Sequence, residues 1–161
     1  MTISNNDEHT EAFKYVLFLL SKAEYPAVKV RNKLKQRDVP QEIASQVITE
    51  CEKKGYINDS RWLEQFVHSQ AKRKKGPQWI RAKLASIGFQ ADKDELDALL
   101  EEYCSKEEQK EQIRSLLESR RGTTVDLNNP KERAKFVRKL TAKGYDLNTI
   151  FALINDETRK V

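Results

Sequence analysis

The sequence holds few of the residues that break helices or build reactive sites. It has five glycines, four prolines, two cysteines and two histidines among 161 residues. The glycines do not cluster, so neither a phosphate-binding P-loop nor a dinucleotide-binding glycine pattern is present. Asp, Glu, Lys and Arg make up 34% of the chain. Such a charged sequence with little glycine and proline is typical of an all-α protein and argues against a β-sandwich or barrel.

Catalytic and metal-binding patterns are also missing. His9 and His68 lie far apart, and no cysteine stands at ligand spacing from either, so we expect no zinc site. No segment resembles the nucleophile elbow of hydrolases. Carboxylates are frequent between Asp92 and Glu111, but on helices such groups more often form solvated faces than acid–base pairs. We therefore expect no enzyme, no metal and no cofactor.

The cysteines and the apolar runs indicate where the protein works. Cys51 and Cys104 fall inside helical patterns without CxxC spacing, which predicts two free, buried thiols in a reducing compartment. The most apolar short run, residues 16–20, is too short to span a bilayer. It also lacks the layout of a secretory signal peptide. We expect a cytoplasmic protein.

Apolar residues recur at the helical period along almost the whole chain after residue 9. Residues 1–9 are polar, and we expect them to be flexible. Proline or cap residues predict helix starts, and glycines predict helix ends. The predicted starts are Pro26, Pro40, Asn58-Asp59-Ser60, Gly76-Pro77, Asp92 and Asn129-Pro130, and the predicted ends are Gly55, Gly88 and Gly144. We expect the buried face of the first helix to consist of Phe13, Val16, Leu17 and Leu20. We expect that of the last helix to consist of Ile150, Phe151 and Ile154.

One short pattern occurs three times. Residues 30–34, 80–84 and 136–140 read VRNKL, IRAKL and FVRKL, and share apolar-x-x-Lys-Leu. Gly88 and Gly144 follow the motif leucine by four residues in the later copies, where the first copy has Asp38. We therefore predict three tandem three-helix repeats, at 10–55, 56–104 and 105–161. Units this small must stack on one another, which predicts an all-α, elongated and curved array.

Positive charge is concentrated in the middle of the chain. Residues 71–88 carry six positive charges, and no acidic residue stands between Glu64 and Asp92. Residues 92–111, in contrast, hold nine acids against three lysines. Surface helices usually mix the two signs, so this separation favours a protein with one face on a polyanion. The residues that we expect to bind are Arg61, Lys72, Arg73, Lys74, Lys75, Arg81 and Lys83.

Plainer interpretations of this segment stay open. His68 lies in a polar stripe with Arg61 and Lys72, and such a stripe could be only a solvated helix face. Trp79 could stack on a nucleic-acid base, although packing is the commoner role of a tryptophan on a helix. Basic residues also occur in the middle helices of the first and third repeats. If the repeats stack in register, these helices form one basic track with sequence-independent, salt-sensitive binding.

Two segments carry a resemblance to a known family. The residues GYINDSRW at 55–62, followed by the pattern KGPxxIRxKLxxxG at 75–88, resemble the signature of RecX proteins, which regulate the bacterial RecA recombinase. The resemblance implies a fold of tandem three-helix repeats. It also implies binding to RecA and to RecA filaments on single-stranded DNA. Such binding would restrain ATP hydrolysis, strand exchange and the co-protease activity that triggers the SOS response.

The chain departs from the family pattern in small ways. Asn58 stands where Asp is frequent, and Ile87 stands where Lys is frequent, which removes one charge from the basic stretch. The third repeat shares only the general pattern. From the resemblance we expect a monomer that lies along the groove of a RecA filament. Two alternatives remain: an autonomous, helix-turn-helix-like DNA-binding protein, and a protein scaffold whose basic faces only confer solubility.

Overall fold

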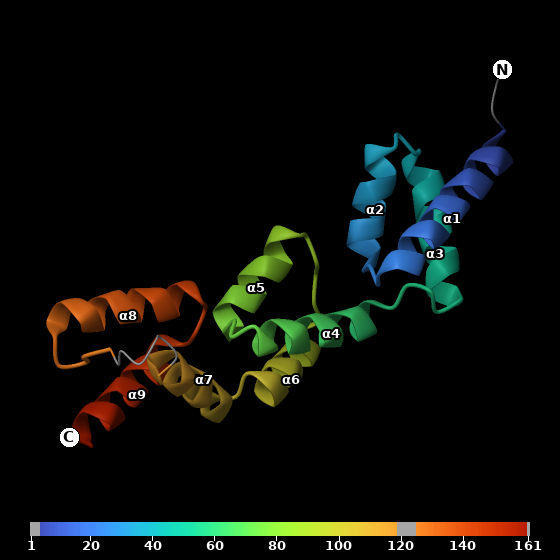
Figure 1. Ribbon diagram of the computed structural model, residues 1–161. Coiled ribbons are helices and arrows are strands. Elements are labelled where there is room, and N and C mark those ends of the chain that lie inside the picture. Colours follow the sequence, from blue (N-terminus) through green and yellow to red (C-terminus); the bar gives the residue numbers. More distant parts are fainter. Residues whose placement is uncertain (1–3, 119–124, 161) are drawn as a thin grey trace. The chain divides into compact units, whose positions relative to one another are not determined.

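The secondary structure is entirely helical in the part of the chain that the structure, a computed structural model, describes: residues 4–118 and 125–160. These residues form nine α-helices and no strand (Figure 1). The helices are α1 (Asn5–Lys22), α2 (Ala27–Gln36), α3 (Gln41–Lys53), α4 (Asp59–Lys72), α5 (Pro77–Ser86), α6 (Lys93–Tyr103), α7 (Lys106–Glu118), α8 (Pro130–Ala142) and α9 (Leu147–Arg159). The all-α prediction is confirmed. The division into three repeats and the elongated, curved array stay predictions.

Helix starts follow the cap residues that the sequence indicates. Pro26 and Pro40 precede the first residues of α2 and α3, because proline fixes φ in the helical range and needs no N–H partner. Asn58 accepts a hydrogen bond from the Arg61 N–H at 3.0 Å and so caps α4. Asn129 caps α8 in the same way, with Pro130 at the first helical position.

The three aligned helix ends share one backbone conformation. Gly88 and Gly144 have φ values of +76° and +89°, and Asp38, at the same place in the first copy, has φ +59°. A left-handed residue turns the chain out of the helix, and aspartate tolerates it better than most side chains. The next N–H, of Val39 or Tyr145, then bonds back to the carbonyl of the motif leucine at 3.1 and 3.3 Å.

The first helix begins earlier than the sequence indicated. We expected flexible residues up to position 9, but α1 starts at Asn5. The Ser4 side chain accepts a hydrogen bond from the Asn6 N–H at 3.3 Å. Asp7 and Glu8 in the first turn also interact favourably with the positive end of the helix dipole. These polar residues therefore start a helix; residues 1–3 lie outside the described part.

The chain forms two compact units, and α4 contributes to both. The first unit comprises residues 4–65 and 87–89, and in it α1 and α2 pack on α3 (Figure 1). Its buried core includes Ala12 and Val16 of α1. Leu17, predicted to lie inside, is 38% exposed, whereas Leu19 is buried. The buried residues of α1 are at positions 12, 16 and 19, a slightly rotated face with the same period, and Phe13 and Leu20 are partly buried against the core.

Within this unit, the start of α4 is held against α2. The Asp59 carboxylate accepts a hydrogen bond from the Ala27 N–H at 2.9 Å, and so supplies the side-chain cap that Pro26 cannot. The Trp62 ring lies 5.1 Å from the Phe89 ring, and the Lys29 ammonium lies 5.5 Å from the Trp62 ring. These contacts join residues far apart in sequence.

The second unit comprises, among the described residues, 66–86, 90–118 and 125–160. Its main buried cluster is formed by α7, α8, the turn after α8, and α9. The cluster residues are Ile113, Leu116, Leu117, Phe136, Leu140, Tyr145, Ile150, Leu153 and Ile154. Phe151, predicted to lie inside, is 42% exposed, and Leu153 takes the buried place. As in α1, the helical period is right and the centre of the buried face is displaced.

Two chain corners in this unit meet backbone to backbone. We call this contact the corner clasp: residues 74–79, where α4 passes into α5, against residues 143–145, after α8. The Gly76 N–H donates to the Lys143 carbonyl at 2.7 Å, and the Gln78 N–H donates to the Gly144 carbonyl at 2.9 Å. A Cβ atom on Gly76 would overlap the Gly144 carbonyl, and one on Gly144 would overlap the Trp79 backbone. Only glycine permits this approach.

The buried Tyr145 side chain completes the corner clasp. Its hydroxyl lies 2.9 Å from the Lys74 carbonyl oxygen and 2.9 Å from Gln112 Oε1. The Gln112 amide in turn donates to the Ala71 carbonyl at 3.1 Å. Burial raises the pKa of Tyr145, so the ring stays neutral and polar groups from α4, α7 and the turn after α8 satisfy one another.

Both cysteines are free and buried, as predicted. Burial raises the pKa of the Cys104 thiol to about 11, with smaller contributions from Asp146 and Glu108. Burial, followed by the charge of Glu50, also raises the pKa of Cys51. Thiols that stay protonated and covered react slowly.

The Cys104 thiol predicts a loss of stability in alkali. The folded protein holds this proton more tightly than the unfolded chain, so its contribution to stability is complete below about pH 9 and disappears as the pH rises towards about 11. We expect Cys104→Ala to show a flatter pH dependence over that interval. Urea unfolding of both proteins across the interval measures this, and parallel curves for the two proteins would contradict it.

Candidate polyanion-binding surface

Six of the seven predicted binding residues lie in the second unit. Lys72 ends α4, residues 73–75 form the turn that leads into α5, and Arg81 and Lys83 follow on α5. Lys74 adopts a left-handed conformation, with φ +60°, which turns the chain from α4 towards Gly76. Arg61 belongs to the first unit. Residues 72–83 therefore lie at the corner between α4 and α5, whereas Arg61 belongs to the other unit.

The two central lysines are held by neighbours. The Lys74 ammonium donates to the Ser115 hydroxyl of α7 at 2.7 Å. The Lys75 ammonium lies 4.9 Å from the centre of the Trp79 ring. Trp79 is half-buried, and its backbone meets Gly144 in the corner clasp. These contacts favour the packing role for Trp79 over stacking on a base.

Two of the three predicted arginines, Arg81 and Arg61, already contact a carboxylate. Arg81 pairs with Asp97 at 2.7 Å, and Lys93 pairs with the same carboxylate at 2.9 Å. Hydrogen bonds from Arg81 and then Lys93 lower the pKa of Asp97. Arg61 pairs with Glu24 at 2.6 Å. Exposed ion pairs of this kind contribute little to stability, but they leave less positive potential for a ligand.

Two further lysines lie at the corner, from a part of the chain outside our seven candidates. Burial lowers the pKa of Lys143, and the charges of Lys75, Lys139 and Lys74 lower it further. We refer to Lys74, Lys75, Lys139 and Lys143 as the corner lysines. In the sequence, Lys139 and Lys143 were visible only as part of the basic composition of the third repeat. That composition does not indicate which of its side chains lie at the corner between α4 and α5.

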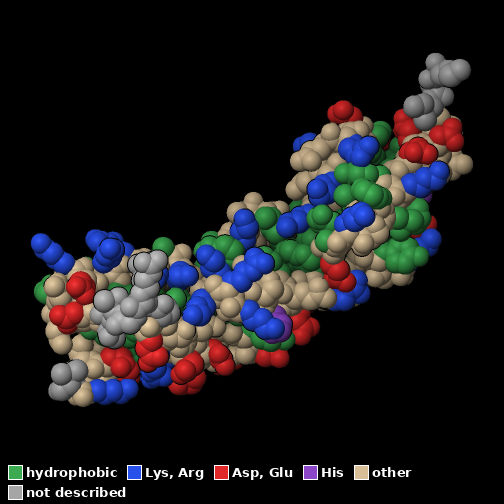
Figure 2. Space-filling view, viewed as in Figure 1, with side chains coloured by type: hydrophobic (Ala, Val, Ile, Leu, Met, Phe, Trp, Pro, Cys, Tyr) green, Lys and Arg blue, Asp and Glu red, His purple; other side chains and the backbone are tan. Residues whose placement is uncertain are grey.

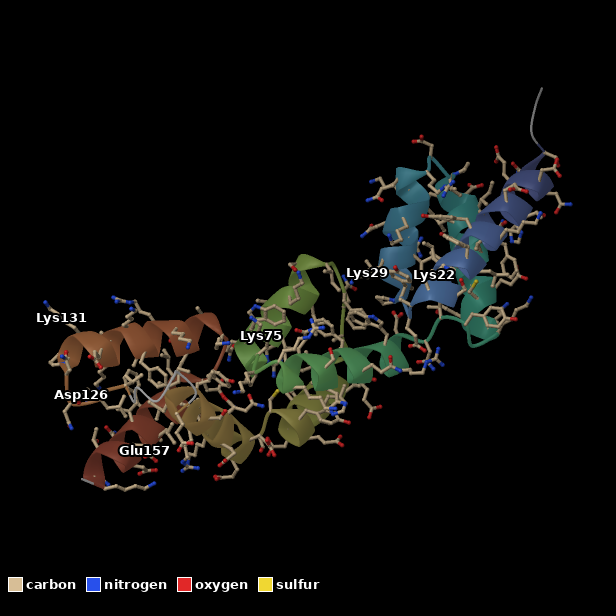
Figure 3. The ribbon with its side chains drawn as sticks, viewed as in Figure 1. Lys22, Lys29, Lys75, Asp126, Lys131 and Glu157 are labelled. Atoms are coloured by element: carbon tan, nitrogen blue, oxygen red, sulfur yellow. The ribbon has the colours of Figure 1, made fainter. Side chains whose placement is uncertain are left out.

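Charge is divided between two sides of the second unit. On the face drawn in Figure 2, Lys and Arg side chains gather over α4, α5 and α8, and a row of Asp and Glu side chains follows the other edge, over α6, α7 and α9. Lys75 lies where α8 ends, whereas Glu157 lies on α9 away from that corner (Figure 3). Glu157 pairs with Lys160 at 2.9 Å and Arg114 at 3.5 Å. The charge polarity that the sequence indicated is therefore present in three dimensions.

His68 is exposed, as the stripe on α4 predicted. Its ring lies 4.7 Å from the Tyr103 ring of α6. The middle of the stripe therefore also contacts another helix. In the described ranges, no group of three or more His, Cys, Asp and Glu residues is placed to hold a metal ion. None of the helices described has the length and apolar character that crossing a membrane requires.

The fold and this surface define a protein that is all-helical in its described residues and whose second unit has a basic and an acidic side. Similar proteins are known, although no protein-family model matches the chain. The regulatory protein RecX of Pseudomonas fluorescens is 31% identical over 137 residues, which cover 85% of both chains. That of Pseudomonas savastanoi pv. phaseolicola is 30% identical, with the same coverage. The chain therefore belongs to the RecX family of regulatory proteins.

Solved structures agree with this assignment at the level of the fold. The crystal structure of RecX from Lactobacillus salivarius has a TM-score of 0.77 and 22% identity, and the match covers 94% of this chain and 97% of that one. Another crystal structure of a regulatory protein RecX has a TM-score of 0.76 and 24% identity, over 94% and 73% of the two chains. The helical architecture is thus that of RecX proteins, as the sequence resemblance implied.

Proposed function

We propose that the protein is a cytoplasmic regulator that binds the RecA recombinase and RecA filaments on single-stranded DNA. Binding restrains RecA's ATP hydrolysis, strand exchange and co-protease activity, and so modulates DNA repair, recombination and the SOS response. The observation that carries this proposal is family membership, with 31% identity over 85% of the chain. The basic side of the second unit supports it, because a filament on DNA presents a polyanion.

A physical mechanism follows from binding alone. RecA protomers must shift relative to one another during filament turnover, and a ligand that prefers one arrangement lowers the population of the others. The basic side can approach phosphates of the bound strand, while the acidic residues of α6 and α7 can approach basic protein loops. No catalytic group is required on the regulator, and a monomer is sufficient for this action.

The ATPase of RecA on single-stranded DNA gives the direct test. We expect this protein to suppress the rate at substoichiometric amounts, and we expect more protein to be needed when the salt concentration is raised, because phosphate contacts are screened. The measurement is a titration at two salt concentrations. A separate binding assay without RecA shows whether the protein simply coats the DNA.

Two outcomes would contradict the proposal. One is an unchanged ATPase rate at excess protein under conditions where the DNA is not coated. The other is tight binding to one duplex sequence in the absence of RecA, which would favour an autonomous DNA-binding protein. A scaffold function would instead appear as partner binding that is insensitive to the charges of residues 72–83.

A further inference from the structure

We infer that the corner lysines form a composite site for consecutive phosphates of a single-stranded nucleic acid. The site combines Lys74 and Lys75, which the basic stretch contains, with Lys139 and Lys143 from the end of α8. It rests on the proposed function for the choice of a single strand as ligand. The proposal adds a location and two residues to that function.

The corner clasp holds the two halves of the site together. The Gly76 N–H donates a hydrogen bond to the carbonyl of Lys143 at 2.7 Å. Gly76 directly follows Lys75, so this bond joins the two halves of the site. The Tyr145 hydroxyl lies 2.9 Å from the carbonyl of Lys74 itself. The backbone is thus anchored at Lys74 and at Lys143. A site whose backbone is fixed in advance loses less entropy when it binds.

Electrostatics distinguish this corner from the other basic positions. The charges that act on Lys143 are those of Lys75, Lys139 and Lys74, and all three disfavour its protonated form. An anion placed among these ammonium groups reverses that repulsion. Arg81 and Arg61 contact Asp97 and Glu24, so an anion must displace a carboxylate from each of these arginines. A phosphate bound beside Lys143 instead relieves a repulsion between like charges.

The chemistry of the site favours phosphates. Each lysine presents a compact ammonium with three rotatable donors, which contacts a phosphate oxygen as a point charge. The planar, two-pronged donor that pairs with a carboxylate belongs to arginine, whereas four basic residues of the corner are lysines, with Arg73 beside them in the same turn. A flexible sugar–phosphate chain can follow several ammonium groups in turn. We therefore assign the corner to a nucleic-acid backbone and treat an acidic protein surface as an outcome of the test.

The test compares two pairs of lysines on the same helix. Fluorescence anisotropy measures the binding of labelled oligothymidylate to the full chain over a salt series. Lys139→Gln/Lys143→Gln removes the α8 half of the site, and Lys131→Gln/Lys135→Gln removes the same charge about two turns earlier on α8. Each lost phosphate contact lowers the salt slope by about 0.7, which is about fivefold in affinity at ~0.1 M salt. We expect about a 25-fold loss for the first pair and less than about fivefold for the second.

Three results would overturn the inference. Equal losses for both pairs would mean that the basic charge acts diffusely. Wild-type affinity and salt slope for Lys139→Gln/Lys143→Gln would mean that the α8 lysines do not touch the strand. Unchanged oligothymidylate binding together with weaker RecA binding would assign the corner to an acidic protein surface. Thermal melting of each variant checks the fold.

Failure of this inference is separable from failure of the proposed function. The oligothymidylate assay contains no RecA, so it reports on the corner lysines whether or not RecA is inhibited. The ATPase titration uses the wild-type chain, so its result does not depend on which lysines bind the strand.

Discussion

Replacing Gly144 with alanine is expected to destabilise the second unit by about 2–5 kcal/mol. Two effects add. Gly144 has φ +89°, where a side chain is strained, and the added Cβ would overlap the backbone of Trp79. Backbone atoms of α5 cannot rotate away as a flexible side chain would, so the corner clasp must open. Urea unfolding followed by tryptophan fluorescence and circular dichroism measures the change.

Gly55 provides the matched control for this substitution. It has a similar positive φ, +75°, but a Cβ there meets no atom within 4 Å. Gly55→Ala should therefore cost only the conformational strain, about 1–2 kcal/mol. Similar costs for the two variants would show that the corner clasp is not as tight as described. Because Gly144→Ala removes no charge, loss of oligothymidylate binding in a folded fraction would further indicate that the clasp positions the lysines.

Reversing Lys74 and Lys75 to glutamate is expected to have the largest effect on binding. Two phosphate contacts are lost, for about 25-fold at ~0.1 M salt, and two repelling carboxylates are added, so binding to a RecA filament should weaken by about 100-fold or more. The salt dependence should also become shallower. Filament binding measured over a salt series reports both quantities.

The fold should tolerate this double reversal. The double variant keeps the backbone bonds of the corner clasp, because Tyr145 and Gly76 contact main-chain atoms. The bond from Lys74 to Ser115 is lost, but the new carboxylates reduce the repulsion on Lys143. We expect nearly unchanged thermal melting. Lys14→Glu/Lys53→Glu, on α1 and α3, changes the net charge equally and should bind almost as the wild type does. If the corner variant also does so, residues 72–83 are only a solvated face.

Local features of this protein were readable from single residues and their spacing. Pro26, Pro40, Asn58 and Asn129 begin helices because their effect on the backbone acts within a few residues. The left-handed helix ends at Gly88 and Gly144 likewise follow from the residue type. Periodicity indicated the burial of Val16 and Ile150 but misplaced Leu17 and Phe151. A helix face is only known to within one residue until its packing partner is known.

The candidate site shows the same limit. The sequence located Lys72–Lys75 by their lack of neighbouring acids, and it indicated the charge polarity of the region. It could not indicate that Asp97 pairs with Arg81, or that Glu24 pairs with Arg61, because each contact joins residues far apart in the chain. The family resemblance could not indicate these contacts either, because a sequence signature in residues 55–88 does not show which carboxylates pair with Arg61 and Arg81.

The sequence by itself determined the helical class, the helix ends, the family and the side that carries positive charge, since each depends on residue type or short-range spacing. Tertiary structure alone decided which lysines share a site. Lys143 joins Lys74 because two glycines, Gly76 and Gly144, allow two backbones to touch and hydrogen-bond. That contact depends on the absence of two side chains at positions far apart in the chain, and no local pattern specifies which two positions will meet.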